Sequence, residues 1–259
     1  MILFSNGDSH TSGGEIEYEY QPTCYDKAWP QKLANKLNYE SINISRSGNS
    51  NQTIFRTTQD WVIENVIIDK KYKPEDVLVI IMWSGFDRQE VYFPDKNCLD
   101  SVNPHSNPNL YYSKMRSEIK KLQKTIVSFH DNLNSDFRAL SMVYSLSYWL
   151  DGMNIKHYFL NGLYHFPEIN YLNSNYNHHA LYNSYRNLLL MYGEEKINNH
   201  YAFSNPDDTF FKHMSNFSGM SPVKHSKYGH FGEDGHEYWA NRVYDFFFNK
   251  NEIVIKKLI

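Results

Sequence analysis

Two short segments at opposite ends of the chain carry residue types that could perform nucleophilic chemistry. Near the N-terminus a Gly-Asp-Ser run ends at Ser9. A serine hydroxyl is a poor nucleophile until a base takes its proton, so Ser9 needs a histidine from elsewhere in the chain. Residues 229–236 contain two histidines. We expect His230, in a loop before the final helix, to be the base, whereas His236 falls within that helix and packs or faces solvent.

The elements that must position these residues alternate between strands and helices. Apolar runs predict strands at 2–5, 41–44, 76–83 and 155–160. Helical spacing predicts helices at 26–37, 54–68, 114–130, 136–150 and 234–248. The run 76–83 is continuously apolar, as is typical of a parallel strand buried on both faces. The pattern predicts a three-layer α/β/α sandwich with a mostly parallel, flavodoxin-like central sheet.

We expect one domain over residues 1–259, with a loop-rich insertion around 88–112, and we assign no element to the Asn/Tyr/His-rich stretch 170–183. In open α/β sheets, ligands bind beyond the carboxyl ends of the strands. Ser9, Gly48 and residues 83–85 all follow predicted strands. Three separate loops should therefore converge on one site.

Composition excludes several classes of function. The net charge of −3, without a long basic run, argues against a nucleic-acid partner. Cys24 and Cys98 are the two cysteines, which excludes a disulfide framework and a Cys-rich zinc module. The longest apolar run, 77–83, is far shorter than the roughly 20 residues of a membrane helix, so no membrane association is expected. The N-terminus lacks the features of a signal peptide, which predicts a cytoplasmic or virion-associated protein.

The segments around both candidate residues resemble the SGNH (GDSL-like) hydrolase family. The family's first block is matched by residues 7–11, Gly-Asp-Ser-His-Thr. Gly48 occupies the place of the second-block glycine, and His230 precedes a Gly-His pair as in the last block. The resemblance implies an esterase with Ser9 as nucleophile and His230 as base, in which the N–H groups of Ser9 and Gly48 bind the oxyanion.

The chain departs from the family in two places. The third block should read Gly-x-Asn-Asp, but residues 83–88 lack that asparagine. Since one oxyanion donor is worth roughly 100- to 1000-fold in rate, we expect a replacement, with Asn51 as first candidate. The family's acid lies three residues before the histidine, where this chain has Lys227. A dyad, a main-chain carbonyl, or Asp207 or Asp208 could serve instead.

Four further residues are predicted to support the loops or to contact substrate, namely Asp8, Ser84, Asp87 and Arg88. Asp8 adjoins Ser9, which favours a role in holding the nucleophile loop. Arg88, with Trp83 and the run 50–56, suggests a phage-encoded branch of the family acting on host glycans. The predicted function is removal of a small, acetyl-like acyl group from a carbohydrate or other polar ester, without a cofactor or metal. The oligomeric state stays open.

Two other functions compete with this interpretation. Asp8 and His10, two residues apart, are similar to the first block of metal-dependent phosphoesterases, and residues 85–88 echo a second block. The missing asparagine and acid also allow a catalytically impaired protein that binds glycans or forms part of a virion. Retention of Ser9 and His230 favours the esterase.

Overall fold

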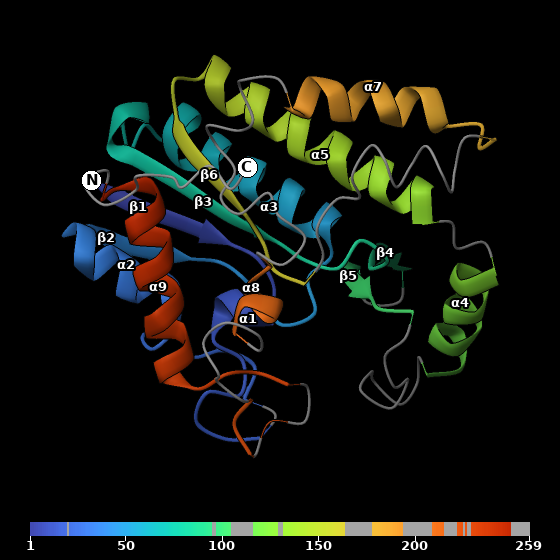
Figure 1. Ribbon diagram of the computed structural model, residues 1–259, viewed down its shortest axis with the longest axis horizontal. Coiled ribbons are helices and arrows are strands. Elements are labelled where there is room, and N and C mark those ends of the chain that lie inside the picture. Colours follow the sequence, from blue (N-terminus) through green and yellow to red (C-terminus); the bar gives the residue numbers. More distant parts are fainter. Residues whose placement is uncertain are drawn as a thin grey trace, which may run out of the picture.

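A four-stranded parallel sheet forms the centre of the molecule (Figure 1). The computed structural model describes residues 1–19, 21–94, 97–104, 116–128, 132–163, 178–193, 209–214, 222–224, 226 and 229–249. The strand order is β2-β1-β3-β6, and each neighbouring pair is parallel. The strands are β1 (Ile2–Asn6), β2 (Glu40–Asn43), β3 (Val77–Trp83) and β6 (Lys156–Asn161). All four lie within one or two residues of the predicted strands.

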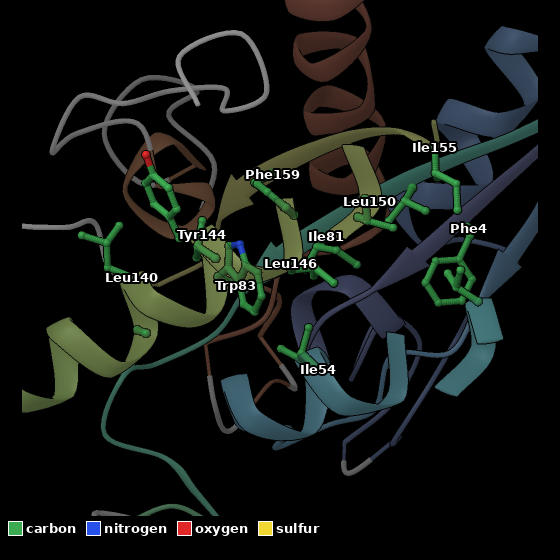
Figure 2. Packing of buried hydrophobic residues seen from close by; sticks show 14 of the residues in the cluster. Phe4, Ile54, Ile81, Trp83, Leu140, Tyr144, Leu146, Leu150, Ile155 and Phe159 are labelled. Atoms are coloured by element: carbon green, nitrogen blue, oxygen red, sulfur yellow. The ribbon is translucent and has the colours of Figure 1, made fainter. Parts of the chain in front are cut away.

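Helices cover both faces of the sheet and create two hydrophobic cores. One core, shown in Figure 2, packs the sheet against α3 (Asn51–Val62), η1 (Ile63–Ile68), α5 (Asn132–Gly152) and α7 (Tyr182–Gly193). The other packs it against α2 (Trp29–Leu37), α8 (Phe210–Lys212) and α9 (Glu233–Phe247). Every residue of β3 is buried, as its continuous apolar run predicts. The fold is therefore a three-layer α/β/α sandwich with a flavodoxin-like strand order.

The predicted helices are present with shifted ends. The helix predicted at 54–68 begins at Asn51, because the Ser50 side chain caps it by accepting a hydrogen bond from Thr53 N. Helix α4 covers Arg116–Ser128 within the predicted range 114–130. In α9, Trp239, Ala240, Val243 and Phe247 are buried, whereas Phe246 is exposed.

The predicted loop-rich insertion contains a β-hairpin. Strands β4 (Gln89–Phe93) and β5 (Cys98–Val102) pair antiparallel. Their residues are mostly half-buried or exposed, so the sequence lacks the apolar alternation that marks a strand packed on a core. Residues 105–112 of the insertion and 170–177 lie outside the described residues. No helix in the described ranges is long and apolar enough to cross a membrane.

Candidate active site

Ser9 begins a single-turn helix directly after β1. This helix, α1 (Ser9–Ser12), is capped by Asp8, whose Oδ1 accepts a hydrogen bond from His10 N at 3.0 Å. It ends at Gly13, whose φ of 72° is left-handed and favours glycine. The Ser9 residue is 8% exposed, at the carboxyl end of the sheet where the topology predicts a site.

His230 lies just before α9 and pairs with Glu15, a residue that the sequence interpretation did not select. Its Nδ1 donates a hydrogen bond to Glu15 Oε2 at 2.9 Å, and both side chains are almost fully buried. The hydroxyl of Ser226 donates to the same carboxylate oxygen at 2.6 Å and accepts from His230 N at 2.7 Å. With Nδ1 engaged by a carboxylate, Nε2 is the ring nitrogen that can act as a base.

The backbone at Glu15 has an unusual conformation, which a hydrogen bond within the loop stabilises. Glu15 has a φ of 56°, in the left-handed region that costs a non-glycine residue about 1 kcal/mol or more. Its N–H donates to Gln21 O at 2.9 Å, which holds the loop in this conformation. The carboxylate partner of His230, expected near the histidine in the sequence, thus comes from the loop that carries Ser9. Lys227, Asp207 and Asp208 lie outside the described residues.

Two contacts bring the Ser9 loop to the His230–Glu15 pair. The rings of His10 and His230 have centroids 4.7 Å apart. Gly14, the residue before Glu15, donates its N–H to Ser9 O at 2.8 Å, and a Cβ at Gly14 would lie 3.1 Å from Ser9 Cβ. The loop that carries Ser9 therefore lies beside His230 and Glu15.

His10 is buried beside His230 in an aromatic environment. Its ring centroid lies 5.2 Å from that of Phe210. Burial, reinforced by the neighbouring His230 and only partly opposed by Asp8, lowers the pKa of His10 to about 3. His10 is therefore neutral near pH 7 and places no positive charge next to the His230 imidazole.

Asp8, Ser84 and Arg88 form a buried polar cluster behind the nucleophile loop. Asp8 Oδ2 accepts from Ser84 Oγ at 2.7 Å and from Arg88 Nη1 at 3.1 Å. Burial acts to raise the pKa of Asp8, but the Arg88 guanidinium, His10 and these hydrogen bonds bring it below its usual value. The charged carboxylate thus connects the loop after β1 to the loop after β3, which are the first and third blocks. Asp87 is half-buried in the same loop.

The second-block loop, which follows β2 and contains Gly48 and Asn49, is attached to the same cluster. Asn49 Nδ2 donates to Gly7 O at 3.0 Å, and Arg88 Nη1 donates to Asn49 O at 3.2 Å. Gly48 has a φ of 84° and open space where a side chain would lie. Within the described part of the chain, neither the Ser9 nor the Gly48 N–H donates a hydrogen bond.

Asn51 has a structural partner on the third-block loop. Its Oδ1 accepts from Ser84 N at 2.8 Å, and its Nδ2 donates to Ser84 O at 3.3 Å. The amide therefore joins the start of α3 to the end of β3. One hydrogen of Nδ2 is used in this contact, and the donor role of Asn51 stays a prediction that depends on the second hydrogen.

Comparisons with known proteins place the chain in a family and identify structures of similar architecture. A family model described as a family of unknown function (DUF6071) matches residues 12–255. The chain belongs to this family. No curated protein matches it.

Solved structures similar to this DUF6071 member include TesA, at 13% identity and a TM-score of 0.49, covering 96% of this chain and 99% of that one. A lipolytic protein of the G-D-S-L family from Veillonella parvula has 14% identity, a TM-score of 0.48 and coverages of 95% and 98%. The carbohydrate acetylesterase Est24 from Sinorhizobium meliloti has 14% identity, a TM-score of 0.42 and coverages of 95% and 99%.

His236, the other histidine of the last block, has a packing role in this DUF6071 chain. It is 1% exposed, and its Nδ1 accepts a hydrogen bond from Trp29 N at 3.2 Å. Burial, together with the nearby His10 and His230, lowers the pKa of His236 to about 3. Of the two alternatives expected for His236, packing or facing solvent, the residue packs, and its contact holds the start of α2 against α9.

Proposed function

We propose that the protein is a serine-dependent ester hydrolase with Ser9 as nucleophile, His230 as base and Glu15 as the acid that orients the base. The observation that carries the proposal is the buried hydrogen bond from His230 Nδ1 to Glu15 beside the Ser9 loop. A carboxylate in this position fixes the tautomer of the imidazole and stabilises its charged form. Glu15 would supply the function of the aspartate that the SGNH family places three residues before its histidine and that this chain lacks.

The proposed reaction proceeds in two stages. Ser9 Oγ attacks the ester carbonyl carbon while His230 Nε2 takes the hydroxyl proton, and His230 then returns that proton to the leaving alcohol. Water, activated by the same nitrogen, releases the acid and restores Ser9. The oxyanion of each tetrahedral intermediate would be bound by the N–H groups of Ser9 and Gly48, with Asn51 as a further donor.

The substrate we favour is a small acyl group on a polar alcohol such as a carbohydrate. Gly14 packs against Ser9 so closely that a methyl added at Gly14 would be 3.1 Å from Ser9 Cβ and 3.3 Å from Ser47 Oγ. This side of the nucleophile therefore leaves little room. The polar side chains of the surrounding loops suit a hydroxylated leaving group better than a lipid chain.

The competing functions receive less support from the site. In a metal-dependent phosphoesterase Asp8 would be a metal ligand, but its carboxylate is paired with the Arg88 guanidinium, whose charge opposes a divalent cation. The alternative of a catalytically impaired binding protein was based partly on the absence of an acid near His230 in the sequence. Glu15 removes that part of the motivation, because a binding protein has no need for a buried carboxylate on the histidine.

The proposal is tested by covalent labelling and turnover. A fluorophosphonate probe should modify wild-type protein at Ser9, identified by peptide mass spectrometry, and p-nitrophenyl acetate should be hydrolysed. Ser9→Ala should abolish both signals, and His230→Ala should reduce turnover by about 10⁴-fold or more. The matched control is Ser128→Ala, an exposed serine at the end of α4. Unchanged turnover in Ser9→Ala, or labelling at another serine, would disprove the mechanism.

The substrate class is tested separately from the mechanism. Acetate release from acetylated sugars should be compared with hydrolysis of a long-chain p-nitrophenyl ester by the same preparation. We expect kcat/KM to fall as the acyl chain lengthens. A preference for long chains would overturn the substrate assignment and leave the assignment of Ser9 and His230 in place.

A further inference from the structure

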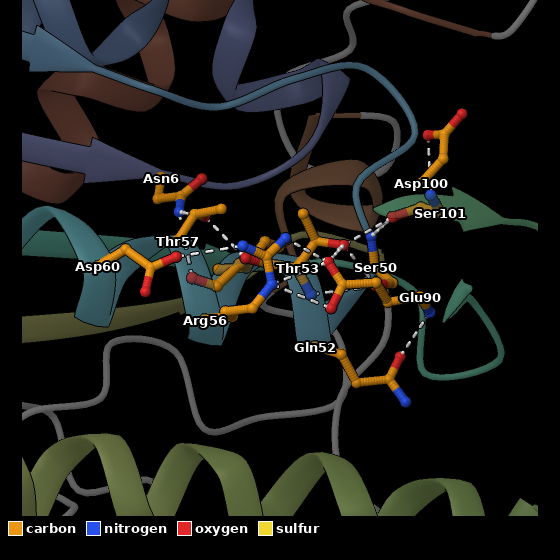
Figure 3. A network of polar contacts seen from close by, with 11 residues as sticks. Asn6, Ser50, Gln52, Thr53, Arg56, Thr57, Asp60, Glu90, Asp100 and Ser101 are labelled. Atoms are coloured by element: carbon orange, nitrogen blue, oxygen red, sulfur yellow. Dashed lines mark hydrogen bonds and ion pairs between the residues drawn. The ribbon is translucent and has the colours of Figure 1, made fainter. Parts of the chain in front are cut away.

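Hairpin β4–β5 presents a pair of polar side chains to the first half of helix α3 (Figure 3). Glu90 on β4 and Ser101 on β5 are directly opposite each other in the antiparallel ladder. Both side chains contact Thr53 of α3, with Thr53 Oγ1 at 3.0 Å from Glu90 Oε1 and 2.9 Å from Ser101 Oγ. The hairpin is therefore joined to α3 by polar contacts on one face.

Ser101 also reaches the main chain of the second-block loop. Its hydroxyl accepts a hydrogen bond from Ser50 N at 2.8 Å. Ser50 is the N-cap of α3 and stands two residues after Gly48. A side chain of the hairpin thus fixes the backbone next to the N–H group that we propose as an oxyanion donor.

Glu90 fastens the hairpin in the position that this contact requires. Its carboxylate accepts three hydrogen bonds from the Arg56 guanidinium, the shortest at 2.6 Å from Nη2. Its N–H donates to Gln52 Oε1 at 3.0 Å. The Glu90 side chain is 11% exposed and the Arg56 side chain 39%, so the carboxylate of this bidentate pair is shielded from water and the guanidinium is partly open to it.

Helix α3 is in turn fixed to the central sheet. Asn6, the last residue of β1, donates from Nδ2 to Ile54 O at 3.1 Å and to Thr57 Oγ1 at 2.9 Å. With Asn49 bonded to Gly7 and to Arg88, the segment 48–50 is held from the nucleophile loop, from the third-block loop and from the hairpin.

We propose that hairpin β4–β5 is a positioning element for the oxyanion site, and that Ser101 and Glu90 are positioning residues for the Gly48 N–H. The inference rests on the proposed esterase function. An oxyanion donor must be held within about 0.5 Å of its productive place. Loss of the Ser101 hydroxyl frees Ser50 N–H and loosens the turn at Gly48, which weakens binding of the transition state more than binding of the ester.

The experiment compares Ser101→Ala with two matched variants. Ser101→Thr keeps the hydroxyl and suits a strand, and Tyr92→Phe removes a hydroxyl of the same hairpin that bonds to Asn97. We expect Ser101→Ala to lower kcat on p-nitrophenyl acetate about tenfold with little change in KM. Ser101→Thr should recover most of the loss, and Tyr92→Phe should match the wild type. Hydrogen exchange should show faster exchange of the peptide containing Ser50 in Ser101→Ala alone.

The outcomes separate this inference from the proposed function. If the wild type hydrolyses the ester and Ser101→Ala has the same kcat, the positioning role is overturned. The proposed esterase function is then unaffected. A loss of kcat that Ser101→Thr does not recover, with a matching fall in Tm, would also overturn it, because the effect would be one of folding. A wild-type protein that neither hydrolyses the ester nor reacts with the fluorophosphonate would overturn the proposed function, and the positioning role with it.

Discussion

The carboxylate of Glu15 accepts a hydrogen bond from His230 Nδ1 across a sequence separation of 215 residues. The contact joins the first loop of the sheet to the loop before the last helix. Both partners are buried, and Ser226 adds a second donor to the same carboxylate oxygen. If the histidine is the base in a serine esterase, this carboxylate determines which ring nitrogen faces the nucleophile.

Substitution of Glu15 by glutamine should reduce kcat by about 100- to 10⁴-fold with a small change in KM. The amide retains the shape but not the charge, and it can bond to the histidine in the wrong tautomer. Turnover of p-nitrophenyl acetate by Glu15→Gln should be measured against Glu17→Gln, which removes a partly exposed carboxylate of the same loop. Equal activities of the two variants would show that Glu15 has only a structural role.

Gly14→Ala should lower kcat about tenfold at a small cost in stability. The added methyl would approach Ser9 Cβ to 3.1 Å and Ser47 Oγ to 3.3 Å, so one of these side chains must shift by a few tenths of an ångström. Displacements of reacting groups by about 1 Å can cost roughly 100-fold in rate. Gly152→Ala is the control, because a methyl there meets no atom within 4 Å. Full activity in Gly14→Ala would place the catalytic hydroxyl away from this contact.

The sequence predicted the four strands of the central sheet, the layers and the proposed nucleophile and base, because these depend on local patterns. The apolar run at β3 and the Gly-Asp-Ser after β1 are readable without knowledge of tertiary contacts. Glu15 was missed because we sought the acid near the histidine, and no local pattern distinguishes it from the neighbouring Glu17. The one available signal was its position six residues after Ser9, in a loop already expected at the site.

Hairpin β4–β5 was missed for a different physical reason. Its strands are stabilised by polar contacts with α3, such as Glu90 with Arg56, rather than by an apolar face buried on a core. The period-two hydrophobic pattern that reveals a strand is therefore absent. Contacts of this kind become visible only when α3 and the hairpin are seen side by side.

The free energy of unfolding should fall as the pH is lowered from about 6.5 towards 3, because buried histidines must stay neutral. Burial and nearby histidines lower the pKa of His236 from 6.5 to about 3. Between these values the unfolded state binds the proton and the folded state does not, so stability rises with pH in this window. One such histidine contributes a loss of about 2 kcal/mol between pH 7 and pH 5.

Urea unfolding of wild type and His236→Gln at these two pH values measures the effect. Glutamine can accept the hydrogen bond from Trp29 N but does not titrate, so the variant should lose less stability than the wild type on acidification. The control is His178→Gln, which replaces an exposed histidine. An identical pH dependence in His236→Gln would mean that His236 is not held neutral by the fold.

The last prediction concerns Asn51, whose amide bonds to both the N–H and the carbonyl of Ser84. If its second Nδ2 hydrogen serves the oxyanion, Asn51→Ala should lower kcat by about 100- to 1000-fold. The variant also leaves the buried Ser84 N–H unpaired, which should cost about 1–3 kcal/mol of stability. A fall in Tm by itself therefore does not reveal the donor role.

Asn43→Ala provides the comparison that separates the donor role of Asn51 from its structural role. Asn43 forms a similar bridge, donating from Nδ2 to Thr11 O at 2.9 Å and accepting from Ser45 N at 3.1 Å, but it lies at the end of β2 rather than at the start of α3. Both variants should lose stability, and only Asn51→Ala should lose kcat by two orders of magnitude or more. If the two lose kcat to the same extent, Asn51 serves only to join α3 to the third-block loop. The second side-chain donor must then come from another residue, while the roles of Ser9 and His230 are unaffected.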